Sequence, residues 1–78
     1  MFSYRHYRKR YASRIRTTDS LPSKGLWVKV SEAADRLGLS PQTIRIRAFK
    51  RLAGKEGLPC IRVRRPGMKR GVLYVRIE

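Results

Sequence analysis

The stretch Gly38-Leu39-Ser40-Pro41 constrains the fold of this 78-residue chain more than any other. Glycine readily adopts the left-handed conformation in which many helices end, so Gly38 predicts the end of one helix. Serine is a favourable N-cap, and proline suits the first helical position because its missing N–H has no helical partner there. Ser40 and Pro41 therefore predict a second helix that follows the first after a short turn.

The first helix is predicted to begin with Ser31 as its N-cap, because the acidic residues Glu32 and Asp35 then lie near the positive end of the helix. Its apolar face consists of Ala33, Ala34 and Leu37. A short extended segment, Trp27–Val30, precedes it, and the second helix is predicted to run to about Leu52.

The C-terminal part of the chain predicts a β-hairpin. A loop rich in Gly and Pro, Ala53–Pro59, separates it from the second helix. Strands are expected over Cys60–Arg65 and Val72–Ile77, with a turn through Pro66-Gly67. Alternation predicts an inward set of Ile61, Val63, Leu73, Val75 and Ile77. It predicts an outward set of Arg62, Arg64, Tyr74 and Arg76.

Two helices joined by a tight turn are the arrangement of a helix-turn-helix, in which one helix crosses the DNA backbone and the other enters the major groove. The segment Val30–Phe49 resembles the pattern of that family. It has a small residue where the helices cross (Ala34), a glycine in the turn (Gly38) and a β-branched residue in the second helix (Ile44).

The longer stretch "WVKVSEAADRLGLSPQTIR", followed by a basic hairpin, resembles the winged-helix domains of phage excisionases and MerR-like (mercury-resistance-type) regulators. The resemblance covers Trp27–Ile77 and implies an α+β fold. That fold is a small winged helix-turn-helix of two helices plus a β-hairpin wing, over residues 26–78.

Residues 1–25 have no counterpart in that resemblance. They are rich in Lys and Arg, poor in aliphatic residues and end in turn formers, which is typical of a basic N-terminal arm that is flexible without its partner. Helical spacing of Tyr4, Tyr7, Tyr11 and Ile15 leaves a second alternative open, in which the arm is partly helical and amphipathic.

The charge of the chain points to a polyanionic partner. There are 20 Lys and Arg residues against 5 Asp and Glu, which gives a net charge of +15 at pH 7. Neutralising phosphates with Lys and Arg releases condensed counterions, so this balance favours nucleic acid as the partner over an anionic membrane.

Base reading is assigned to the second helix. If Ile44 points into the core, helical rotation places Gln42 and Ile46 on the opposite side, flanked by Arg45. Glutamine recognises adenine and arginine recognises guanine, so Gln42 and Arg45 are the first candidates. Phe49 is expected to pack beneath the loop or the wing. The candidate DNA-binding residues of this recognition helix are Ser40, Gln42, Thr43, Arg45, Ile46, Arg47 and Lys50.

Arg47 and Arg51 are predicted to turn toward the first helix, where Glu32 and Asp35 are candidate partners. Ion pairs or phosphate contacts are favoured for both over base reading.

Two further groups of cations are expected to meet the DNA backbone or a narrow minor groove. In the wing these are Arg62, Arg64, Arg65, Lys69 and Arg70. In the arm they are Arg5, Arg8, Lys9, Arg10, Arg14 and Arg16.

The function implied is sequence-specific binding of double-stranded DNA, by an excisionase-like architectural factor or a transcriptional regulator. An integrase or recombinase, or further copies of the protein on DNA, are the implied protein partners. The alternative is an RNA-binding structural protein such as a ribosomal component, for which a similar charge is ordinary; the helix-turn-helix spacing favours DNA.

No enzymatic activity, cofactor, metal or small-molecule substrate is expected. His6 has no carboxylate pair near it in the sequence, and the single cysteine, Cys60, forms no internal disulfide or cysteine-based metal site and is expected to be buried. No apolar run has transmembrane length, and the N-terminus lacks a signal-peptide stretch. A cytoplasmic, nucleoid-associated protein is expected, and the excisionase resemblance implies a phage or mobile element in a bacterial host.

Overall fold

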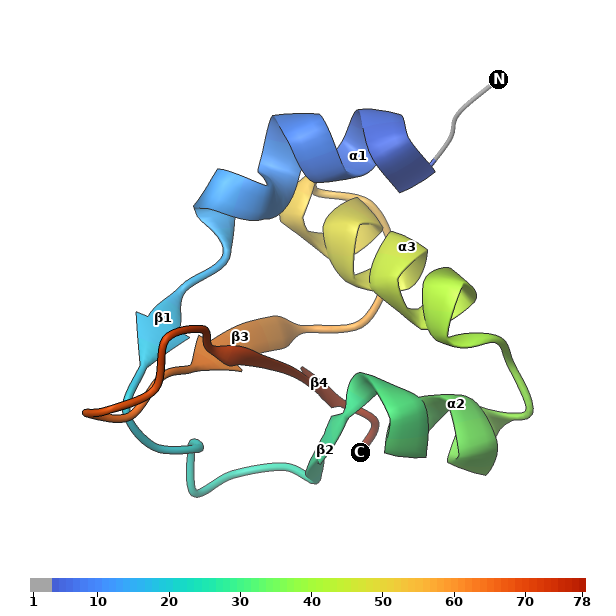
Figure 1. The fold of residues 1–78 in the computed structure, drawn as a ribbon. Helices are drawn as coiled ribbons and strands as arrows, with labels where there is room; N and C mark the ends of the chain where they lie inside the picture. Colours follow the sequence, from blue (N-terminus) through green and yellow to red (C-terminus); the bar gives the residue numbers. More distant parts are fainter. Residues whose placement is uncertain (1–3) are drawn as a thin grey trace.

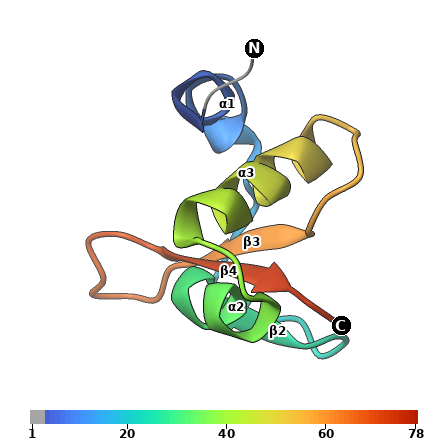
Figure 2. The same ribbon diagram turned by 90° about the vertical axis from the view of Figure 1, so that its right-hand side faces the viewer.

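Residues 4–78, which the computed structural model describes, contain three α-helices, a 3-10 turn and four strands (Figure 1). In chain order these are α1 (Tyr4–Tyr11), η1 (Ala12–Arg14), β1 (Thr17–Thr18), β2 (Trp27–Lys29), α2 (Val30–Leu37), α3 (Pro41–Leu52), β3 (Cys60–Val63) and β4 (Val72–Arg76). The predicted α+β class is confirmed. Figures 1 and 2 show α1 above α3, and α3 above β3 and β4.

The turn between α2 and α3 has the predicted conformation. Gly38 is left-handed with φ of 68°, and the Leu39 N–H donates to the Ala34 carbonyl at 2.9 Å, which closes the end of α2. The Ser40 side chain accepts a hydrogen bond from the Thr43 N–H at 3.2 Å, and Pro41 is the first residue of α3. Local capping chemistry therefore sets this junction.

The start of α2 differs from the prediction. The helix begins at Val30, so Ser31 is not its N-cap; Lys29 occupies that position, and its side chain makes no capping hydrogen bond. The last residue of β2 is also Lys29, so the strand continues directly into the helix. Val30 is only 6% exposed, and burial of this side chain fixes the helix start in place of a side-chain cap.

Helices α2 and α3 pack against each other, and small residues lie in the core that they share. Ala34 is 4% exposed and Ile44 fully buried, and both belong to the core that also holds Ala33 and Ala48. An alanine at a crossing lets two helices approach closely, because its side chain occupies little space between them.

We expect Ala34→Leu to lower the free energy of unfolding by about 1–3 kcal/mol, because the larger side chain overpacks this crossing. Chemical denaturation measures the change. Asp35→Leu adds the same side chain at an exposed position of α2 and should change stability by less than about 0.5 kcal/mol. Equal effects of the two substitutions would contradict the crossing.

The sheet has the strand order β1-β3-β4-β2, with β1 parallel to β3 and the other pairs antiparallel. Cys60 is paired with Val75, and Ile61 with Tyr74. Paired residues of a ladder share a face, so Ile61 does not share a face with Val75.

The predicted inward set of the hairpin is therefore wrong for Ile61 and Val63, whereas Leu73, Val75 and Ile77 face the core as predicted. Cys60 and Val75 face the core around α3, while Ile61 and Val63 are buried on the other face at 7% and 4% exposure. The hairpin loop sets the pairing register, and alternation within each strand does not reveal it. The turn through Pro66-Gly67 is present as predicted.

Residues of the expected arm belong to the same core. Tyr7 and Ile15 are each 6% exposed and lie in one cluster with Phe49. Residues 16–18 pair with β3, because the Arg62 N–H donates to the Arg16 carbonyl and the Arg64 N–H to the Thr18 carbonyl, both at 2.8 Å.

These contacts correct the expectation of a separate arm ending at residue 25. Residues Tyr4–Tyr11 form a helix, as the partly helical alternative predicted, and are not a flexible arm. The apolar face of this helix, α1, packs on α3. The side chain of Tyr4 lies outside the described part of the structure.

Cys60 is buried in this core, as predicted. Desolvation raises the pKa of its thiol to about 11, so the side chain is a protonated, apolar group at neutral pH.

Candidate nucleic-acid interface

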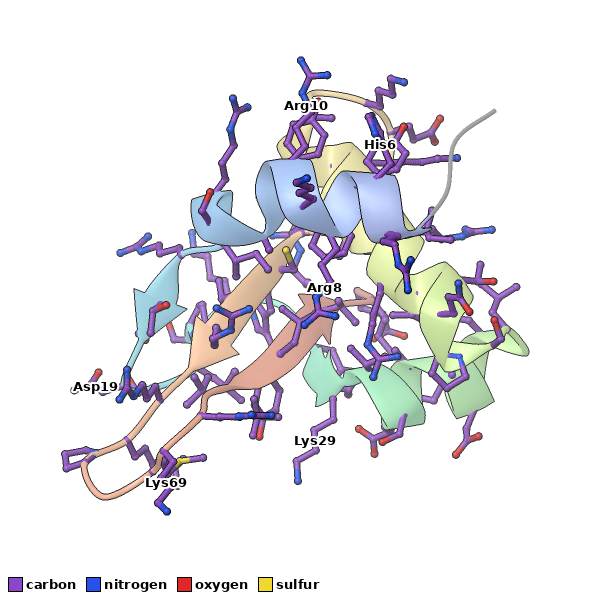
Figure 3. All side chains as sticks on the ribbon, turned by 45° about the horizontal axis from the view of Figure 1, so that its top comes forward. His6, Arg8, Arg10, Asp19, Lys29 and Lys69 are labelled. Atoms are coloured by element: carbon purple, nitrogen blue, oxygen red, sulfur yellow. The ribbon has the colours of Figure 1, made fainter. Side chains whose placement is uncertain are left out.

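A concave surface lies between α1, α3 and the β3–β4 hairpin. It consists of two hollows, of about 450 and 290 Å³, which share Arg8, Arg62 and Gly71. The cations that line it are Arg8, Arg45, Arg62, Arg64, Lys69 and Arg70. We call this surface the basic groove. In Figure 3, Arg8 lies between α1 and the hairpin, and Lys69 is near the hairpin tip.

Tertiary structure, not nearness in sequence, brings these cations together. Arg62 pairs with Thr17 of β1 and Leu73 of β4, so its side chain shares the sheet face that is turned to the helices. Gly71 leaves space for it, since a Cβ there would collide with the stem of Arg62. Arg62 was predicted to share the outward face with Tyr74, which is wrong because Tyr74 pairs with Ile61.

The first two turns of α3 remain accessible beside the groove. Gln42 is exposed, Thr43, Arg45 and Ile46 are partly buried, and Arg45 borders the groove. The Ser40 hydroxyl lies 2.9 Å from that of Thr43 in addition to its capping bond. Ser40 therefore shapes the start of α3.

The C-terminal part of α3 is covered by α1 (Figure 1). Phe49 is 3% exposed in the cluster that contains Tyr7 and Ile15. The expectation that Phe49 packs inside is confirmed, and its cluster also contains Cys60 of β3 and Val75 of β4. The side of α3 that packs against α1 is thus closed to a nucleic acid, whereas its first two turns remain accessible.

Arg47 and Lys50 lie outside the basic groove. They border a separate hollow with Glu56, Gly57 and Leu58 of the loop after α3. The Arg47 carbonyl accepts a hydrogen bond from the Leu58 N–H at 3.2 Å, which holds the loop against this side of the helix.

For Arg47 and Arg51 either ion pairs or phosphate contacts were predicted, and the ion pairs with Glu32 or Asp35 are not among those of residues 4–78. Glu32 pairs instead with Arg36 of its own helix at 3.7 Å, and both side chains are about half exposed. Four-residue spacing along one helix favours this partner over one on a second helix.

The cations of the expected arm point in several directions. Arg8 lines the groove, whereas Arg10 and Arg14 lie over the ring of Tyr11 at 5.8 and 5.2 Å from its centroid. Figure 3 shows Arg10 at the top of the molecule, away from the hairpin. Arg5, Lys9 and Arg16 are exposed, and Arg16 borders a hollow with Leu21 and Pro22.

The cations of the hairpin divide between the two faces of the sheet. Arg64, Lys69 and Arg70 line the groove, and the Arg64 Nε donates to the Met68 carbonyl at 3.4 Å. Arg65 instead borders a hollow on the opposite face with Val63. Three of the four tip cations therefore join the groove.

None of the residues that line the groove in the described part of the chain is acidic. Gathering like charges in one concavity raises the local positive potential and attracts anions. Sequence reasoning missed Thr17 and Gly71 at this site. A glycine beside a strand is a signal of close approach, but nothing local indicates that Thr17 pairs with Arg62.

Among residues 4–78 no cluster of three or more His, Cys, Asp or Glu side chains could hold a metal ion. No helix within the same range has the length and apolar character needed to cross a membrane. Comparison with known protein families, curated proteins and solved structures finds no match for the chain.

Proposed function

We propose that the protein binds double-stranded DNA in a sequence-specific manner as a winged helix-turn-helix, with α2 and α3 as the two helices and the β3–β4 hairpin as the wing. The observation that carries this proposal is the basic groove, which joins the accessible start of α3 to the hairpin through cations with no acidic neighbour. Phosphate contacts supply affinity and base contacts supply specificity, and the two parts of the surface are suited to these two roles.

The accessible part of α3 determines how it meets the bases. With α1 on its C-terminal part, α3 enters the major groove by its first two turns, which is where recognition helices of this class contact base edges. Gln42 reads adenine, Arg45 reads guanine, and Ile46 contacts a thymine methyl group. The hairpin tip then follows the adjacent backbone or minor groove.

The process served by this binding follows from the excisionase resemblance alone. An architectural factor bends DNA and recruits an integrase or further copies of itself, and a regulator blocks or recruits the transcription machinery. Neither role needs a catalytic group. In both roles the protein binds DNA in the cytoplasm of a bacterial host and is encoded by a phage or mobile element.

The experiment is selection of preferred sequences from random duplex DNA, followed by affinity measurements at equal salt on the selected duplex, a scrambled duplex and a structured RNA. We expect the selected duplex to bind tightest. Tightest binding to the RNA would support the alternative of an RNA-binding structural protein, and a selection that yields no preferred sequence would overturn specific recognition.

Single substitutions then test base reading. Gln42→Ala and Arg45→Ala should each cost about 1–3 kcal/mol of binding free energy on the selected duplex and change affinity for the scrambled duplex far less. Arg51→Ala, at an exposed position of the same helix outside the groove, is the control. Equal losses on both duplexes would reject base reading by Gln42 and Arg45.

A further inference from the structure

The larger hollow of the basic groove has the composition of an anion site. Its lining includes five cations, Arg8, Arg62, Arg64, Lys69 and Arg70, together with the side chain of Thr17. The guanidinium group offers paired N–H donors that match two oxygens of a phosphate, and a hydroxyl adds a further donor. No acidic side chain of residues 4–78 competes in this lining.

The fold fixes the backbone positions of Arg8, Thr17 and Arg62 before any ligand arrives. Arg8 follows Tyr7, which is buried, so the position of α1 fixes the root of Arg8 above the sheet. Thr17 is fixed beside Arg62 by the parallel pairing of β1 with β3. Arg62 is partly buried, with its stem over Gly71. Preorganised donors lose little conformational entropy on binding.

The number of cations in the hollow also indicates how many negative charges its ligand carries. One phosphodiester carries a single negative charge, and five cations around one hollow repel one another unless more than one such charge is present. Consecutive phosphates of a nucleic-acid strand supply this charge, as does one doubly ionised terminal phosphate.

We infer that this hollow is a phosphate clamp. Arg8 of α1, Thr17 of β1 and Arg62 of β3 bind consecutive backbone phosphates of the bound duplex. The hairpin cations Arg64, Lys69 and Arg70 enclose these phosphates from the other side. The inference rests on the proposed function and assigns to α1 a contact that the helix-turn-helix and wing do not include. The clamp reads no bases; it fixes the position along the duplex at which α3 reads them.

The test uses Arg8→Gln and its matched control Arg10→Gln, which removes the same charge from the same helix outside the hollow. On the selected duplex, Arg8→Gln should bind about tenfold more weakly, as expected for loss of a charged hydrogen bond, and Arg10→Gln much less so. The duplex is then prepared with single neutral methylphosphonates, one position at a time. The wild type should lose affinity at consecutive positions of one strand, and Arg8→Gln should be insensitive at those same positions.

Equal losses for the two variants, or unchanged methylphosphonate sensitivity in Arg8→Gln, would overturn the clamp while leaving DNA binding intact. A duplex with a 5′-phosphate, compared with the same duplex without it, distinguishes backbone phosphates from a terminal phosphate. If the 5′-phosphate raises affinity and Arg8→Gln abolishes this gain, the hollow binds strand ends instead of consecutive backbone phosphates.

A second measurement does not depend on duplex binding. Titration with pyrophosphate, followed by NMR of the arginine Nε–H groups, should shift Arg8 and Arg62 before Arg10 and Arg51. Selective shifts without sequence-specific DNA binding would refute the proposed function and retain an anion site, whereas uniform shifts would refute the site itself.

Discussion

Replacing the hairpin cations Arg64, Lys69 and Arg70 with glutamine is expected to reduce the salt dependence of DNA binding more than a triple substitution outside the basic groove. Each lost phosphate contact lowers the slope of log affinity against log salt concentration by about 0.9, so three contacts lower it by about 2.7. The variant should also lose any preference for an A·T-rich flank beside the site of α3, because narrow minor grooves attract arginine.

The control for this variant is a triple substitution of Arg10, Lys24 and Arg51. All three are exposed and lie outside the linings of the basic groove, and their replacement changes the net charge equally. Salt titrations of the two variants on duplexes that differ only in the flank provide the comparison. Equal slopes for the two variants would show that the hairpin acts through net charge alone and is not a wing.

Phe49→Ala is expected to lower the free energy of unfolding by about 3–5 kcal/mol, the usual cost of removing a buried phenylalanine. Phe49 is 3% exposed and belongs to the cluster that joins α1 to α3. Small domains have total stabilities on the order of 5 kcal/mol or somewhat more, so this variant should be largely unfolded at moderate temperature.

Thermal and denaturant unfolding measure the effect of Phe49→Ala, with Leu37→Ala as the control. Leu37 is 42% exposed, contrary to its predicted place on the apolar face of α2, so its substitution should cost far less. Phe49→Leu retains much of the volume and should remain folded, which permits binding measurements on the same site. A small loss for Phe49→Ala would contradict the packing of α1 on α3.

The parts of the fold that the sequence predicts are those fixed by neighbouring residues. Gly38, Ser40 and Pro41 determine the α2–α3 turn through backbone conformation and capping, so their positions in the chain suffice. The hairpin register depends on contacts between strands, and the pairing of Ile61 with Tyr74 has no local signal.

The candidate site was predictable only as a set of charges. The cations of the hairpin and of α3 could be identified by residue type, but helical spacing does not reveal which cation of α1 faces the sheet. Arg8 and Arg10 have the same charge and lie on the same short helix, yet only Arg8 lines the groove. That difference is set by the burial of Tyr7 and Ile15, which orients α1 on its neighbours.

The parallel pairing of β1 with β3 has a consequence for folding kinetics. The two strands are separated in the chain by β2, α2 and α3, so their contact closes a long loop, and contacts of this kind form slowly. The α2–α3 unit needs only local contacts and is expected to form early. During synthesis Thr17 leaves the ribosome long before Arg62, so this pairing waits for β3. A folding intermediate with α2 and α3 formed is therefore expected to have Gln42 and Arg45 in place before Thr17 and Arg62 meet.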